Sequence, residues 1–122
     1  MSNGPVLILG QSDPRVMMEA SLTQMFTKVL GNLSALPQPQ PQLLASVQEM
    51  QAKRQAVNVA VLSTNVTPDS LGTLLNQFKV SCEAAIGLAV DTKDPDVIGS
   101  VRCLIEFSNQ IDQNYPRAEL SH

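Results

Sequence analysis

Four stretches of the chain place apolar residues three or four positions apart, the spacing that gathers them on one face of an α-helix. The four apolar stripes are Met18, Leu22, Met25, Phe26, Val29, Leu30 and Leu33; Leu43, Leu44, Val47, Met50, Val57 and Val61; Leu71, Leu74, Leu75, Phe78, Cys82, Ala85, Ile86 and Ala89; and Val97, Ile98, Val101, Leu104, Ile105 and Ile111. Arg54 interrupts the second stripe with a charge. The pattern predicts four amphipathic helices.

Three of these stretches begin with the same short motif, an Asp or Thr directly before a proline. The segments are "SDPR" at 12–15, "VTPD" at 66–69 and "KDPD" at 93–96. An Asp or Thr side chain accepts hydrogen bonds from the free amides of the first turn, and a proline at the first helical position has no amide proton to leave unpaired. We therefore expect helices to start at these three prolines, and a fourth to start near Pro41.

The segment "PQPQP" at 37–41 separates the first two stripes. Alternating prolines disfavour helix and favour an extended polyproline II conformation. No basic residue flanks the segment to orient it in a docking groove. We interpret it as a stiff connection between helices, with a recognition motif for a partner as the alternative.

These patterns favour a single all-α domain over residues 1–122, a small bundle of about four helices, preceded by an apolar N-terminal segment at 1–12 and followed by a frayed tail at 116–122. A parallel α/β sheet competes with this prediction. The segments "PVLILG" at 5–10, "VNVAVL" at 57–62 and "AIGLAV" at 85–90 each resemble a short strand that leads into a helix start. We prefer the all-α fold because the stripe from 69 to 90 continues through "AIGLAV" with one helical period.

The charge, the lengths of the apolar runs and the cysteine count argue against several classes of function. The net charge is −3, and charged residues make up 16% of the chain, against about 25% in a typical soluble domain. An acidic balance argues against nucleic acid as a partner, because its binding depends on Lys and Arg neutralising phosphates. No apolar run approaches the roughly 20 residues of a membrane span. The N-terminal apolar run is too short for a signal peptide core, and two cysteines fit a reduced, cytoplasmic chain.

Residues suited to catalysis or to binding a metal or cofactor are sparse. The single histidine, His122, is the last residue, and neither Cys82 nor Cys103 has further ligands at a metal-binding spacing. "LGQSDP" lacks the further glycines of a dinucleotide loop and the lysine of a phosphate loop. We expect no catalytic, cofactor or metal site.

Two features indicate contact with another protein. On the fourth predicted helix, Phe107 borders the apolar face and Cys103 extends it, so this face is broader than that of an ordinary surface helix. Either this helix is central in the monomer and covered on both sides, or one side of it meets another subunit or a partner. Near the N-terminus, Val6, Leu7, Ile8 and Leu9 form four consecutive apolar positions that are unfavourable to leave in water. We predict that these six residues take part in interactions.

The function predicted from the sequence is therefore a non-enzymatic, helical protein–protein interaction subunit. It would be an oligomer, or a structural or adaptor component of a larger assembly such as a secretion apparatus or a viral or phage particle, by analogy of class alone. Two alternatives stay open at this point: a small α/β enzyme or ligand-binding domain with its site at the strand-to-helix turns, and a helical chaperone that holds a partner's segment in an apolar groove.

Overall fold

A computed structural model describes residues 14–62 and 67–114 of the chain. These residues form helices α2 (Pro14–Ser34), α3 (Pro41–Leu62), α4 (Pro68–Thr92) and α5 (Pro95–Asn114), and they contain no strand. The all-α prediction is confirmed. The α/β alternative is wrong, because 57–62 lies within α3 and 85–90 within α4; "PVLILG" lies outside the described residues.

Every described helix begins with a proline, as predicted from the Asp-Pro and Thr-Pro motifs and from Pro41. At α4, Thr67 Oγ1 accepts a hydrogen bond of 3.1 Å from the Ser70 amide. At α5, Asp94 Oδ1 accepts one of 3.0 Å from the Asp96 amide. These contacts satisfy first-turn amides that have no partner within the helix.

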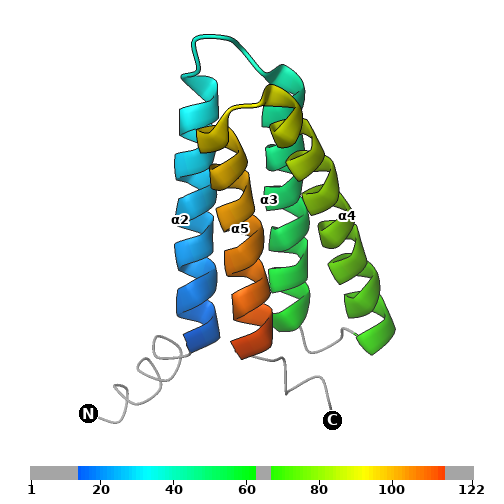
Figure 1. The fold of residues 1–122 in the computed structure, drawn as a ribbon. Coiled ribbons are helices and arrows are strands. Elements are labelled where there is room, and N and C mark those ends of the chain that lie inside the picture. The colour runs from blue at the N-terminus through cyan, green and yellow to red at the C-terminus, as the bar shows by residue number, and fades with distance from the viewer. Residues whose placement is uncertain (1–13, 63–66, 115–122) are drawn as a thin grey trace, which may run out of the picture.

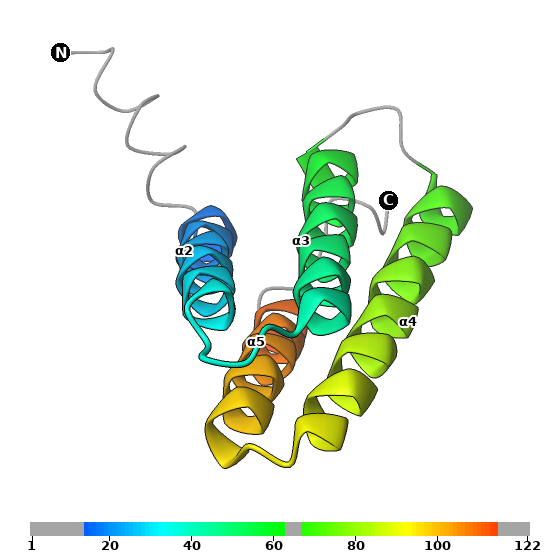
Figure 2. The same cartoon turned by 90° about the horizontal axis from the view of Figure 1, so that it is seen from above.

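The helices run alternately up and down, and each packs against its neighbours in the chain, with α5 returning beside α2 to close the bundle (Figures 1 and 2). Short connections between antiparallel helices favour this arrangement. The α2–α3 connection and the α4–α5 turn lie at one end, called the loop end here. The start of α2 and the end of α5 lie at the other, called the terminal end (Figure 1).

The predicted apolar stripes line the bundle axis. All of their residues are buried or partly buried against the core. The side chains with the least exposure include Leu22, Phe26, Leu43, Val47 and Met50. Each helix thus turns an apolar face inward, which is how amphipathic helices stabilise a bundle.

The Pro-Gln segment joins the end of α2 to Pro41, the first residue of α3. We expect replacement of Pro37 and Pro39 with Ser to lower the free energy of unfolding by only about 1–2 kcal/mol, since the prolines mainly restrict the unfolded chain. Association should be unchanged. Chemical denaturation and size-exclusion chromatography measure the two quantities. Loss of association with the fold intact would show instead that the segment is a recognition motif.

Candidate interaction site

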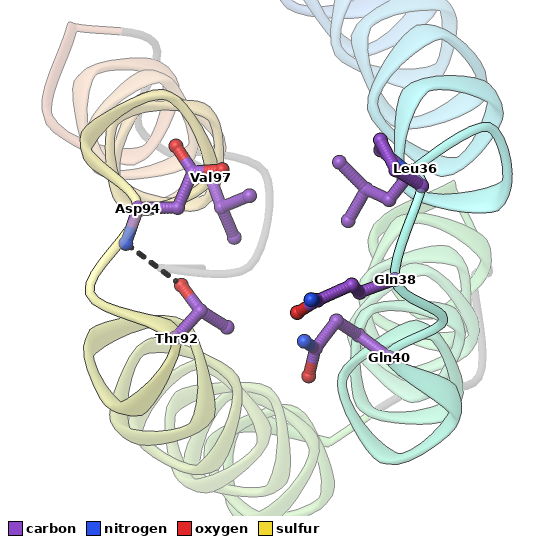
Figure 3. Close-up of a pocket in the computed structure, with 7 residues that line it drawn as sticks. Leu36, Gln38, Gln40, Thr92, Asp94 and Val97 are labelled. Carbon is purple, nitrogen blue, oxygen red and sulfur yellow. Dashed lines mark hydrogen bonds between the residues drawn. The ribbon is translucent and has the colours of Figure 1, made fainter.

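A pocket at the loop end lies between the Pro-Gln connection and the α4–α5 turn, with a volume of about 340 Å³. Figure 3 shows Leu36, Gln38 and Gln40 on one side, facing Thr92, Asp94 and Val97 on the other. The Gln side chains supply neutral amides, while Leu36 and Val97 supply apolar surface. The pocket therefore suits a neutral, partly apolar group better than an ion.

The polar side chains on the α4–α5 side of this pocket have structural roles. Thr92 Oγ1 accepts a hydrogen bond of 3.2 Å from the Asp94 amide and donates one of 2.6 Å to the Ala89 carbonyl. Lys93 adopts a left-handed conformation with φ 59°, and its amide donates to the Val90 carbonyl at 3.0 Å. These bonds end α4 and turn the chain into α5.

A larger groove of about 630 Å³ continues from this end along α2 and α5. Its apolar lining comes from Val29, Leu33, Leu36 and Val97, and its α5 side continues through small residues to Cys103. Cys103 is exposed. Phe107 follows Cys103 by one helical turn on α5 and is partly buried against the core. The structure thus places Cys103 in a groove and Phe107 one turn further along the same helix.

At the terminal half of the bundle, charged side chains from three helices meet in one cluster. Arg54 of α3 contacts Glu19 of α2 through Nη2–Oε2 at 2.7 Å and Nε–Oε1 at 3.2 Å. It also contacts Asp112 of α5 through Nη2–Oδ1 at 3.0 Å and Nη1–Oδ2 at 3.1 Å. Arg15 Nη2 bonds to Glu19 at 3.1 Å and to Asp112 at 3.2 Å. The cluster holds two arginines and two carboxylates, so its formal charges cancel.

Helix α4, which supplies no charge to the ion cluster, covers it with an aromatic ring. The guanidinium carbon of Arg54 lies 5.1 Å from the centre of the Phe78 ring of α4, a distance that permits a cation–π interaction. Burial lowers the pKa of Arg54, but the hydrogen bonds and charges of Asp112 and Glu19 outweigh it and raise the pKa above its ordinary value. Arg54 therefore stays charged and connects α3 to each of the other three described helices.

Beside this cluster, α4 and α5 separate. In Figures 1 and 2 the two helices diverge from their shared turn, and α4 remains beside α3. A groove of about 600 Å³ lies between them. Leu75, Phe78, Ile86 and Ile105 supply its apolar surface, and Asp112 links it to the ion cluster. Polar side chains that include Lys79, Glu83, Asn109 and Gln113 complete its lining.

The two cysteines have different environments. Cys82 lies in the core, where burial raises the pKa of its thiol to about 12, with a smaller opposing effect from the charge of Arg54. At neutral pH its thiol is almost entirely protonated, and its side chain is buried, so it is a poor nucleophile. Cys103 is exposed on α5. A thiol reagent should therefore distinguish the two residues.

The predicted site residues fall into two groups. Cys103 and Phe107 lie on one helix, adjacent to a groove. Val6, Leu7, Ile8 and Leu9 lie outside the described residues. Arg15, Glu19 and Asp112 are not among the site residues predicted from the sequence. Arg15 and Glu19 do share the spacing of Leu22, Phe26, Val29 and Leu33 on α2, and charged residues in phase with a core stripe are the signal that could have identified them.

Within residues 14–62 and 67–114, no group of three or more His, Cys, Asp or Glu side chains could hold a metal ion. No helix of this described part is long and apolar enough to cross a bilayer. Comparisons with known protein families, curated proteins and solved structures gave no match to this chain. Its function is therefore inferred from the geometry of its surfaces.

Proposed function

We propose that this protein is a non-enzymatic helical interaction subunit, a structural or adaptor component that self-associates through the surface where α5 borders α2. We define the α5 edge as the α2–α5 groove together with Cys103 and Phe107. The observation that carries the proposal is the groove itself, a depression of about 630 Å³ with an apolar interior and an exposed thiol at its border.

The chemistry of the α5 edge fits a protein better than a charged ligand. Its lining includes no Lys or Arg, and its carboxylates, Asp94 and Asp96, lie at the start of α5. Asp94 accepts the hydrogen bond that caps this helix. An apolar centre with polar groups toward one end resembles the core and rim of a protein–protein interface, and a groove between two helices can accept a third helix.

The low charge of the chain favours a second copy as the occupant. The net charge is −3 over 122 residues, so two copies meet with little long-range repulsion at physiological ionic strength. In the terminal half, Arg15 and Arg54 pair with Glu19 and Asp112 within each chain.

Labelling of Cys103 tests the proposal. A bulky polyethylene-glycol maleimide at neutral pH should modify Cys103 and leave Cys82 unmodified, and the labelled chain should fail to associate because the polymer covers the α5 edge. Mass spectrometry counts the labels, and analytical ultracentrifugation measures association.

A matched control places the polymer elsewhere. Val80 is 55% exposed on α4, so a Cys103→Ser, Val80→Cys chain carries the label on another helix. This chain should associate as the unlabelled wild type does. If label at Cys103 leaves association intact, or if label at position 80 abolishes it equally, the α5 edge is not the interface.

A further inference from the structure

The groove between α4 and α5 has a different position from the α5 edge and leads to a separate inference. Phe78 and Cys82 form a buried floor, whereas Leu75, Ile86 and Ile105 are only partly buried along its sides. When a further apolar segment covers apolar side chains that are partly exposed in a groove, the free energy of the folded state is lowered. The floor of the groove is thus already buried, whereas its sides have apolar surface that an additional segment could cover.

We propose that the apolar segment Val6–Leu9 of the same chain docks in this α4–α5 groove. The segment carries four consecutive large aliphatic side chains and no charge, flanked by Pro5 and Gly10. It belongs to the part of the chain that lies outside the described residues. Its chemistry matches the apolar sides of the groove.

The position at which the described chain starts supports this occupant. Arg15, the second residue of α2, bonds to Asp112 at 3.2 Å, and Asp112 lines the α4–α5 groove. The start of α2 therefore reaches the lining of the groove through the Arg15 side chain. The α2–α5 groove lies instead beside Leu33 and Leu36, close to the opposite end of α2.

The length of the segment also fits. Residues 10–13 can span up to about 13 Å when extended, a length available to lead from Pro14 toward the groove. Val6–Leu9 can cover a further length of about 13 Å. The helical rise places Leu75 and Ile86 about 16 Å apart along α4. An extended segment of this length therefore covers most of the groove.

Disulfide trapping tests the docking directly. In the 122-residue chain with Cys82→Ala and Cys103→Ser, Ile8→Cys is paired with Asn109→Cys, an exposed position that lines the groove. Diamide, which oxidises two thiols to a disulfide, should rapidly form a bond within one chain. The control pairs Ile8→Cys with Gln55→Cys, which is also exposed and lies next to Arg54, but between α2 and α3. The control should form its disulfide at least ten times more slowly.

A second measurement uses a variant in which residues 6 to 9 are all replaced with Ser. These substitutions change none of the described core residues, so the bundle should still fold, with a melting temperature lower by roughly 5 °C or more because the groove is uncovered. Equal trapping rates at positions 109 and 55, disulfides mainly between chains, or an unchanged melting temperature would each overturn the proposal. Because the α5 edge is not altered in this variant, association should persist, and failure of this inference can be distinguished from failure of the proposed function.

Discussion

Replacing Arg54 with Leu is expected to lower the free energy of unfolding by about 3–5 kcal/mol, because the substitution leaves buried acidic oxygens without their main partner. The Glu19 and Arg54 side chains are each only 4% exposed. Without Arg54, Glu19 retains its bond to Arg15, and Phe78 loses the cation above its ring. Urea denaturation monitored by circular dichroism measures the loss.

The neighbouring residue supplies a matched control. Lys53 pairs with Glu49 at 3.7 Å on an exposed surface, so Lys53→Leu should change the free energy of unfolding by less than about 0.5 kcal/mol. In the double variant Arg54→Leu, Glu19→Leu, stability should recover substantially, since apolar replacement of a whole buried ion pair is often neutral or stabilising. A loss below about 1 kcal/mol for Arg54→Leu alone would contradict the assigned role of the ion cluster.

The second large effect is expected for Phe107→Glu. Phe107 is partly buried, so the new carboxylate can reach water and the bundle should keep its helicity and cooperative melting. Association should weaken by about 2 kcal/mol or more, which is roughly 30-fold in Kd, if the ring is an anchor of the interface. Circular dichroism and analytical ultracentrifugation separate folding from association.

Phe107→Leu is the conservative companion, since it keeps an apolar side chain at the α5 edge and should retain most of the association. An unfolded Phe107→Glu chain would assign the ring to the monomer core instead. A folded Phe107→Glu chain that associates as well as the wild type would exclude the ring from both the interface and the essential core.

Most of the fold could be predicted from local chemistry. The prolines at 14, 68 and 95 follow residues that can cap a helix, and the structure places a helix start at each of them. The continuous stripe from Leu71 to Ala89 correctly favoured one helix over a strand at 85–90. These signals depend on neighbours within one or two helical turns, and such neighbours can be recognised in a single sequence.

The ion cluster and the α4–α5 groove could not be predicted in the same way. Arg54 was recognisable as a charge within a core stripe, but its partners Glu19 and Asp112 lie on other helices and depend on the register between them. The α4–α5 groove depends on the angle at which two helices leave the turn at Lys93. Helical periodicity determines which face is buried, but it does not determine crossing angles.

The central claim is that the α5 edge mediates contact between copies of this chain. Light scattering coupled to size-exclusion chromatography, over a concentration series of the wild type and of Phe107→Glu, tests it most directly. We expect the wild-type mass to rise with concentration to an integral multiple of the single-chain mass, while Phe107→Glu keeps the single-chain mass throughout. A wild type that retains the single-chain mass at the highest concentration, with a profile identical to that of the variant, would contradict the claim.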